Sequence, residues 1–472
     1  MVLRITQNIL LNNALRDISR NAISLNEYRE KLSTGKELNR PSDDPAAFLR
    51  ILPLRNDIES VKRFQQNAVL SRDILNTASS GFQDAADIMS EARKIAVQGA
   101  NGTLSQTDRD TLASQVNQLL KQMVGIANSK LGDRYLFSGA KTSTQAFTLT
   151  DNEKATFVKY NGANQGVSLS IAPGLEVEVH TPGDQLFMKA NRSGIQFTGN
   201  TGVKAGTGAS SGRGQAFLRI SQTGFSNLPT GISAGSSETT ALGNLAYTIS
   251  MGPPNTISVG GGTPVTFDNT STDLQIQTSA GDSVFLDLSA YTGASVSGTL
   301  TSEGKMTWDG GGTYTNIDFS STNLHVKNDT KGEILAVDAT SIVRTGTEMI
   351  SFKGTYDAFN SLVALRDLLQ NKGGLSGGEQ AKQLTALIGE IDKVGELVLE
   401  SLRNIGAKSA NLDTTKDRMG RLELSMDAAL SRDEDVDLSE VILKMTQRDT
   451  SYQASLQVGA RVISTSLLDF LR

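Results

Sequence analysis

The sequence of 472 residues contains no cysteine, one tryptophan and few other aromatic residues. The lack of cysteine excludes disulfides and thiolate metal sites. Because aromatic residues make up only 5% of the chain, the core must be built mainly from Leu, Ile, Val and Ala. No apolar run reaches the roughly 18 residues that a membrane-spanning helix needs, so a membrane partner is not expected. Residues 1–10 also lack the apolar block of a cleavable signal peptide.

The charges show no excess of one sign that would favour nucleic acid. The chain has 45 basic and 50 acidic residues and a net charge of −5, without a basic stripe. A nucleic-acid partner would therefore lack its main energetic term, the neutralisation of phosphates. The length predicts roughly two to four domains.

Glycine, serine and threonine are concentrated in residues 141–354. Short alternating runs such as Val167–Ile171 and Leu274–Ile276 place apolar side chains on one face of a strand. Turn signals such as Asn161-Gly162 separate these runs. The segment therefore predicts a β-rich insert, either one domain or two small ones in series.

The two flanks of this insert carry long helical patterns instead. In the first flank an apolar residue recurs every seven positions, and in the last flank a four-three spacing runs from Leu384 to Leu430. The seven-residue series is Leu54, Val61, Ala68, Leu75, Phe82, Met89 and Ala96. Such repeats predict helices packed along long seams. The expected fold class is α+β: a long antiparallel helical bundle or coiled coil from both chain ends, with a β-rich inserted domain.

The predicted organisation has three parts. Residues 1–44 and 431–472 are terminal coiled-coil assembly helices. Residues 45–140 and 355–430 form a helical rod domain, and residues 141–354 are the insert. Because little else in the chain can cover the apolar stripes of the terminal helices, we expect these helices to be loose in the monomer and to fold during self-assembly. The predicted assembly interface is Leu11, Leu15, Ile18, Leu25, Leu32, Ile442, Met445, Leu456, Ile463, Leu467 and Phe470.

Several patterns resemble catalytic or metal sites without their full context. Gly208–Gly212 matches a nucleophile-elbow string but lies in a Gly/Ser/Thr-rich loop, and the only histidines, His180 and His325, belong to separate alternating runs. Asp433–Asp437 begins like a calcium loop, but Leu438 stands where such a loop needs glycine. We therefore expect no catalytic residue, no cofactor and no metal, and we interpret Asp437 as a helix cap.

The segment from Leu32 to Ala46 reads as a tight corner between two helices. Gly35 is expected to end the first helix, Asp44 to cap the next, and Pro45 to take its first position. This run, with Gly35, Asp43, Asp44 and Pro45, closely resembles the corner of the flagellin family, and Ala96–Ser105 resembles the next landmark of that family.

Two further stretches, Asp133–Thr142 and Tyr452–Leu471, resemble the family members that form the hook–filament junction rather than flagellin itself. The resemblance covers residues 1–145 and 355–472. It implies a secreted structural subunit of the bacterial flagellum, with the insert facing outward and the terminal helices assembled into a ring or helical lattice. A filament-forming flagellin is the alternative, and an adhesin on a flagellar-type scaffold is the second.

The resemblance also implies binding partners and a route of export from the cell. The partners would be other copies of the chain, another hook-associated protein, flagellin, and an export chaperone bound at residues 438–472. Export would follow the flagellar type III channel to the hook–filament junction outside the cell. One residue departs from the family pattern: Pro53 falls inside an expected helix, where it predicts a kink or a restarted helix.

Overall fold

The computed structural model describes residues 7–151 and 156–470, with side chains left out of the description at positions 7, 8, 10, 11 and 462–470. The chain divides into two compact units. The first, called the terminal unit, comprises Met1–Arg72, Leu169–Val177 and Ala410–Arg472. The second, called the β-bearing unit, comprises Asp73–Ser168 and Glu178–Ser409.

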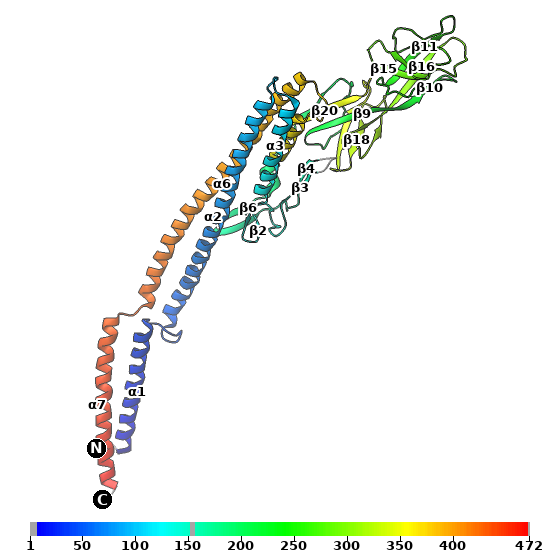
Figure 1. The fold of residues 1–472 in the computed structure, drawn as a ribbon. Helices are drawn as coiled ribbons and strands as arrows, with labels where there is room; N and C mark the ends of the chain where they lie inside the picture. The colour runs from blue at the N-terminus through cyan, green and yellow to red at the C-terminus, as the bar shows by residue number, and fades with distance from the viewer. Residues whose placement is uncertain (1–6, 152–155, 471–472) are drawn as a thin grey trace. The chain divides into compact units, whose positions relative to one another are not determined.

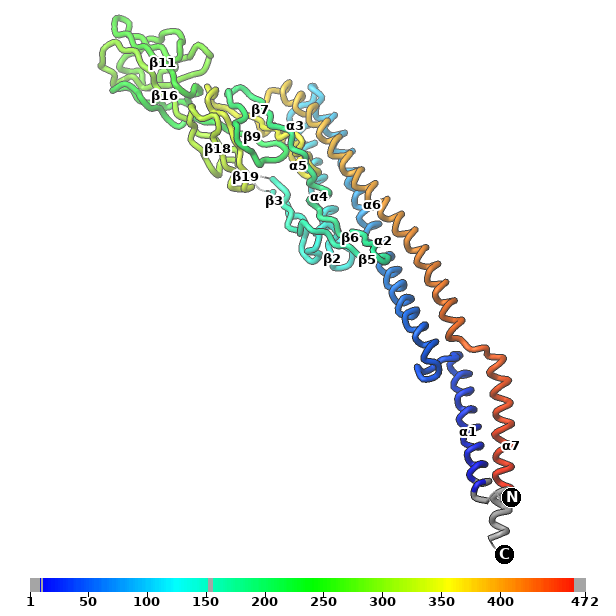
Figure 2. The backbone as a smooth tube through the Cα atoms, turned by 180° about the vertical axis from the view of Figure 1, so that it is seen from behind, coloured from blue at the N-terminus to red at the C-terminus, as the bar shows by residue number. Residues whose placement is uncertain are grey.

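The terminal unit contains the two helices at the chain ends, α1 (Gln7–Thr34) and α7 (Leu438–Phe470). They lie side by side and antiparallel (Figures 1 and 2). Asn21 Nδ2 donates a hydrogen bond to Ser455 Oγ over 2.7 Å. A Cβ atom on Gly459 would lie 3.0 Å from Cδ1 of Ile18, so the missing side chain allows the two helices to approach closely.

Two long helices, α2 (Pro45–Gly99) and α6 (Gly377–Glu434), contribute to both units. The seven-residue series of α2 points inward: Val61 and Ala68 are buried in the terminal unit, and Phe82 and Ala96 are buried in the β-bearing unit. In the terminal unit Val61 packs in one cluster with Met419 of α6. The series predicted a long packed helix, and the structure contains one.

Of the two outcomes expected at Pro53, a kink or a restarted helix, the restart does not occur. α2 continues through Pro53 without a break. Pro53 removes the hydrogen bond that the carbonyl of Leu49 would accept. Leu49 is 73% exposed and Pro53 is also exposed, so this carbonyl lies on a side of the helix where water can take the place of the missing donor.

The β-bearing unit adds three helices, α3 (Gln106–Ala127), α4 (Gly183–Phe187) and α5 (Ala358–Leu369). A capping box formed by Ser105 and Asp108 opens α3. An aromatic cluster joins α2, α4 and α5 with the segment between α3 and α4, and its rings pack in stacked, tilted and edge-on pairs. Its members are Phe82, Phe137, Phe147, Phe187 and Phe359.

The strands of the insert form one long sheet and two smaller ones. The described residues place in the long sheet, in spatial order, β13 (Val265–Thr266), β12 (Thr256–Val259), β11 (Gly243–Ser250), β16 (Val296–Thr307), β9 (Gly214–Ser226), β20 (Gly346–Lys353) and β7 (Gly194–Thr198), with β17 (Thr315–Asn316) paired to β16. The two three-stranded sheets are β10 (Ser233–Ala234), β15 (Ser283–Asp287) and β14 (Leu274–Gln277), and β18 (Leu324–Asn328), β19 (Glu333–Asp338) and β8 (Lys204–Ala205).

Three hairpins precede these sheets. They are β1 (Lys130–Leu131) with β2 (Arg134–Tyr135), β3 (Phe147–Asp151) with β4 (Thr156–Tyr160), and β5 (Val167–Ala172) with β6 (Leu175–His180). Helices at both chain ends and a β-rich middle confirm the predicted fold class. The division into three named domains stays a prediction. In the described part of the chain, no helix is long and apolar enough to cross a membrane.

Candidate assembly surface and helix corner

The corner between α1 and α2 is built from local signals. α1 ends at Thr34, and Gly35 follows with a φ of +72°, a conformation that favours glycine. Asp44 Oδ1 accepts hydrogen bonds from the backbone N–H groups of Ala46 and Ala47 at 2.9 and 3.0 Å. Pro45 is the first residue of α2, where its missing N–H costs nothing. The local structure expected at Gly35, Asp44 and Pro45 is therefore present.

Asp43 holds the corner loop in shape. Its Oδ2 accepts hydrogen bonds from the backbone N–H groups of Arg40 at 2.8 Å and Asn39 at 3.1 Å. The Arg40 N–H is the main reason that the pKa of Asp43 lies below its usual value. The ionised carboxylate thus satisfies two backbone donors that the turn would otherwise leave to water.

The corner is tied to the second helix break, between α6 and α7. The Glu37 N–H donates to the Glu434 carbonyl over 2.7 Å, and the Val436 N–H donates to the Gly35 carbonyl over 3.1 Å. On the far side of this break, Asp437 Oδ1 accepts hydrogen bonds from the N–H groups of Ser439 and Glu440, as expected of a cap for α7. The two breaks in the helices therefore form one joint.

A buried carboxylate lies under this joint. Glu434 is 2% exposed, and its two oxygens contact Arg55 of α2, at 2.6 Å from Nη2 and 3.1 Å from Nε. Lys36 of the corner forms a second ion pair with it. Burial alone would raise the pKa of Glu434, but the hydrogen bonds from Arg55 and Lys36 outweigh it and hold the pKa below its usual value.

The predicted assembly residues fall into three sets. Leu15, Ile442 and Leu456 are 52%, 49% and 44% exposed. Leu25 is buried, and Ile18, Leu32 and Met445 are partly buried. The side chains of Leu11, Ile463, Leu467 and Phe470 lie outside the described residues.

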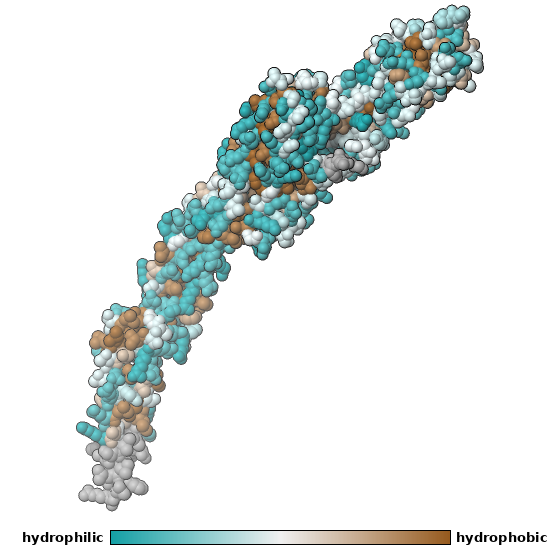
Figure 3. All heavy atoms as spheres, in the orientation of Figure 1, coloured by the Kyte–Doolittle hydropathy of each residue, from teal (hydrophilic) through white to brown (hydrophobic). Residues whose placement is uncertain are grey.

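The exposed large apolar side chains of α1 and α7 are called the terminal apolar surface. They are Ile9, Leu15, Ile23, Leu438, Ile442, Leu443, Leu456 and Val458. Figure 3 shows hydrophobic residues gathered over the start of α7. The sequence interpretation missed five of these because it followed a narrow heptad seam. The available signal was the extra apolar residues beside that seam, which widen the stripe beyond what one partner helix covers.

The patterns that resembled catalytic sites have structural roles. Ser210 Oγ and Ser211 Oγ, within Gly208–Gly212, accept hydrogen bonds from the N–H groups of Ala336 and Ile334 at the edge of β19. His180 is buried with Nδ1 3.3 Å from the Leu136 carbonyl, and burial lowers its pKa. His325 is exposed on β18. Within residues 7–151 and 156–470, no group of three or more His, Asp and Glu could hold a metal ion.

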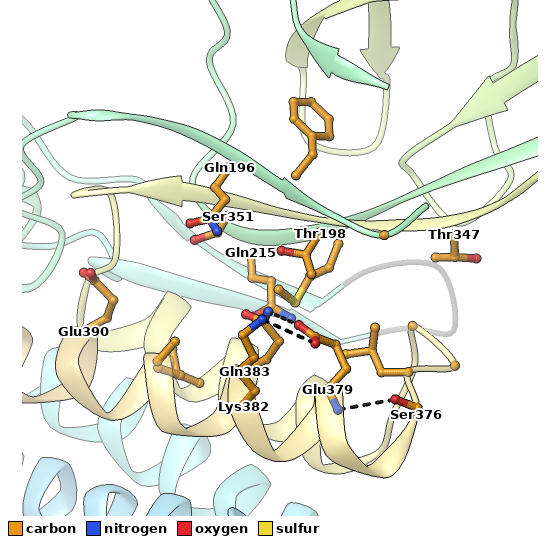
Figure 4. Close-up of a pocket in the computed structure, with 18 of the residues that line it drawn as sticks. Gln196, Thr198, Gln215, Thr347, Ser351, Ser376, Glu379, Lys382, Gln383 and Glu390 are labelled. Atoms are coloured by element: carbon orange, nitrogen blue, oxygen red, sulfur yellow. Dashed lines mark hydrogen bonds and ion pairs between the residues drawn. The ribbon is translucent and has the colours of Figure 1, made fainter. Parts of the chain in front are cut away.

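A polar cavity of about 1170 Å³ lies in the β-bearing unit between the long sheet and α6. Figure 4 shows Gln196, Thr198 and Ser351 on the sheet side, facing Glu379 and Gln383 of α6. Gln383 Nε2 donates to Glu379 Oε1 over 2.7 Å. The amides and hydroxyls of this lining offer hydrogen bonds, and Glu379, Lys382 and Glu390 add charges of both signs.

Comparison with known proteins gives matches to flagellar proteins, and the family match lies in the first helical flank. Residues 5–142 match the bacterial flagellin N-terminal helical region. Over this region the chain is similar to the flagellin family. The chain is 33% identical to a flagellin of Clostridium tyrobutyricum over 29% of its length and 37% of that protein. It is 26% identical to the flagellar hook-associated protein 3 of Escherichia coli K12 over 39% of its length and 57% of that protein.

A solved structure is also similar to this chain. It is the flagellar hook-associated protein 3 of Legionella pneumophila, at 19% identity and a TM-score of 0.46, with 81% of this chain and 98% of that chain covered. The chain spans only part of the length of the two curated relatives, because the matches cover 37% of the Clostridium flagellin and 57% of the Escherichia coli protein.

Proposed function

We propose that this chain is a structural subunit of the bacterial flagellum that joins hook to filament and assembles through α1 and α7. The observation that carries the proposal is the terminal apolar surface on a chain with a flagellin N-terminal helical region. Its work is mechanical: it provides a lattice contact and performs no reaction. Similarity to hook-associated protein 3 over more of the chain than to flagellin favours the junction role.

Burial of the terminal apolar surface supplies the driving force for assembly. Covering one Leu or Ile side chain contributes about 1.5–3 kcal/mol when it passes from full exposure to full burial. The side chains here are roughly half exposed, with Leu15 at 52% and Leu456 at 44%, so each retains about half of that gain for a neighbouring subunit. The combined gain from several such residues on one helix pair offsets the conformational entropy that this pair and its neighbours lose when they become ordered.

The terminal helices are proposed to be only marginally ordered in the monomer. Their mutual contact buries Leu25 but leaves the terminal apolar surface in water, so the pair forms only part of a core. Hydrogen exchange of the monomer should show weak protection of residues 7–30 and strong protection of α5. Full protection of residues 7–30 would contradict this proposal.

The same surface defines the proposed partners: further copies of the chain, another hook-associated protein, flagellin, and an export chaperone that covers residues 438–472 before type III export. The finished subunit would lie outside the cell. Co-purification of the chaperone with the full chain, and its loss after removal of residues 438–472, would support that partner. Retention of the chaperone by the shortened chain would move its site elsewhere.

Immunogold labelling of intact flagella with an antibody against residues 141–354 tests the function. A narrow labelled band between hook and filament is the expected result, with flagella of a deletion strain as the control. Label along the whole filament would instead identify a filament-forming flagellin, the alternative that the 33% identity to the Clostridium protein keeps open. Flagella without any label would overturn both flagellar proposals and favour a role for the insert itself, such as adhesion.

A further inference from the structure

Two stretches of the insert share the spacing of their glycines and alanine. Gly202-Val-Lys-Ala-Gly206 corresponds to Gly231-Ile-Ser-Ala-Gly235, and each stretch continues over the same number of residues to another glycine. These glycines, Gly214 and Gly243, have φ angles of +63° and +86°, and each begins a central strand of the long sheet. A second matching pair of segments is 317–340 and 267–289.

The matching segments make the same hydrogen bonds. Asp318 Oδ1 accepts from the N–H and hydroxyl of Ser320, and Asp268 Oδ1 accepts from those of Thr270. Asp338 accepts in the same way from Thr340, and Asp287 from Ser289. The Gly206 N–H donates to the Ala336 carbonyl over 3.1 Å, and the Gly235 N–H donates to the Phe285 carbonyl over 3.0 Å.

Strand pairing repeats with the same register. β8 pairs with β19, opposing Ala205 to Val337, while β10 pairs with β15, opposing Ala234 to Leu286. β9 lies between β20 and the end of β16, while β11 lies between the start of β16 and β12. Each set of strands closes its own hydrophobic core, one around Leu218 and Val326 and the other around Tyr247 and Ile276.

We infer that the insert contains two copies of one fold, that the second copy is inserted within the first, and that only the first copy carries the surface that docks on the helices. Copy A comprises residues 194–221 and 305–353, and copy B comprises residues 224–303. Copy B occupies the position of the turn that would join β9 to the end of β16. In copy B the equivalent turn is short, at residues 251–255 between β11 and β12.

The docking surface of copy A is a cross-strand pair. Phe217 of β9 lies opposite Met349 of β20, on the sheet face away from the core residues Leu218 and Ile350. Met349 is 2% exposed, and a Cβ atom on Gly373, in the turn between α5 and α6, would lie 2.5 Å from the Phe217 ring. The aromatic ring therefore packs directly against that turn.

Copy B lacks this docking pair. The equivalent cross-strand pair is Ala246 opposite Thr299, and both residues are exposed. Neighbouring positions on the same face carry hydroxyl and amide groups that bond across the strands, such as Thr301 Oγ1 to Asn244 Oδ1 at 2.7 Å. Copy B therefore has apolar residues at the core positions of the fold, but small or polar, solvent-exposed residues at the positions of the docking pair.

A matched pair of core substitutions tests the nesting. Ile276 of copy B and Val326 of copy A occupy equivalent positions and are both 0% exposed. In hydrogen-exchange mass spectrometry, Ile276→Asp in the full chain should abolish protection in β14 and β15 but leave β18 and β19 protected. Val326→Asp should abolish protection in β18 and β19, with secondary loss in copy B because both ends of copy B enter copy A. Loss of protection in β18 and β19 on Ile276→Asp would show one indivisible fold and overturn the inference.

A deletion gives an independent readout. Joining Ser221 to Lys305 through the turn sequence Met-Gly-Pro-Pro-Asn of copy B removes that copy and restores a short hairpin in copy A. Thermal unfolding followed by the fluorescence of Trp308, which lies in the core of copy A, should still show a cooperative transition. The absence of any transition, together with loss of β18 and β19 protection on Ile276→Asp, would reject two separable copies.

The docking claim has its own pair of variants. Phe217→Ala with Met349→Thr gives copy A the small and polar side chains of copy B and should raise hydrogen exchange in residues 371–376 at least tenfold. Ala246→Phe with Thr299→Met is the control in copy B and should leave that segment unchanged. Unchanged exchange in the first variant, or an equal rise in the control, would reject the assignment of docking to copy A.

Discussion

The terminal unit and the β-bearing unit differ in where their large apolar side chains lie. In the β-bearing unit, copies A and B each enclose a core in which residues such as Val326 and Ile276 are fully buried. In the terminal unit, residues of the same type, including Leu443 and Val458, are more than half exposed. The described strands of the β-bearing unit thus enclose their largest apolar side chains in two cores, whereas the described parts of α1 and α7 leave a row of large apolar side chains exposed.

The helix caps show the same difference. Asp357 caps α5 in the β-bearing unit and is 1% exposed, with Oδ1 accepting from the N–H groups of Phe359 and Asn360 at 2.9 and 2.8 Å. Asp44 and Asp437 cap α2 and α7 in the terminal unit with the same geometry but are exposed. An aspartate cap with the same hydrogen bonds thus occurs once in a buried and twice in an exposed position. Substitutions of these aspartates can therefore compare the two units.

Among the cap substitutions, the largest expected effect on folding comes from Asp357→Asn. Burial raises the pKa of Asp357 from 3.8 to about 6. A carboxyl whose pKa is raised on folding stabilises the folded state fully below pH 3.8 and loses that contribution as the pH rises through about 6. The asparagine variant cannot ionise, so wild type should lose on the order of 2–3 kcal/mol relative to the variant between about pH 4 and pH 7, at 1.36 kcal/mol per pKa unit.

Urea unfolding monitored by Trp308 at several pH values measures this difference. A constant offset is expected as well, because Asn360 Nδ2 donates to Asp357 Oδ2 over 2.8 Å and loses that acceptor in the variant. The change with pH, not the offset, tests the prediction. Asp44→Asn is the control and should give the wild-type pH dependence. Parallel curves for wild type and Asp357→Asn would contradict the prediction.

A smaller effect is expected from Asp44→Ala in the terminal unit. Removal of this cap leaves the N–H groups of Ala46 and Ala47 to water, at a cost of about 0.5–2 kcal/mol. The loss should appear in the helical circular dichroism signal, and the Trp308 transition should stay unchanged. Asp44→Ser keeps an acceptor and should recover most of the stability. An equal shift of the Trp308 transition would show that the two units unfold together.

Local signals in the sequence predicted the helices and their ends. The seven-residue series identified α2, and Gly35, Asp44 and Pro45 identified the corner, because each acts on backbone groups within a few residues of itself. At Pro53 the same local reasoning allowed a kink or a restarted helix, and the helix does not restart; the exposure of Leu49 leaves its carbonyl where water can take the place of the lost donor. The predicted fold class depended only on such local patterns and is confirmed.

Features that depend on residues distant in sequence were not predicted. Glu434 reads as one more acidic residue in a run, and its burial depends on Arg55, which lies 379 positions away. The two copies escaped notice because copy B interrupts copy A, and because the cores share the alternation of apolar residues more than the residues themselves. Trp308 of copy A, for example, occupies the position that Val259 takes in copy B. Which face of α1 and α7 stays exposed also depends on how these helices pair, so a heptad count alone could not separate Leu25 from Leu15.

The smallest effect on folding and the largest on assembly should come from Leu456→Asp. Leu456 is 44% exposed on α7, so the substitution should change stability by no more than about 1 kcal/mol, including the lower helix propensity of aspartate. In an assembled lattice the same carboxylate would be buried without a partner, which costs far more than the leucine contact gains. Gln457→Asp adds the same charge at the next exposed position and is the matched control. We expect a wild-type Trp308 transition for both variants, with the junction label lost in flagella that carry Leu456→Asp and kept in those that carry Gln457→Asp. A normal junction label with Leu456→Asp would mean that the exposed leucines of α7 face water in the assembly as well. The difference in apolar exposure between the two units would then concern their folding and not their function.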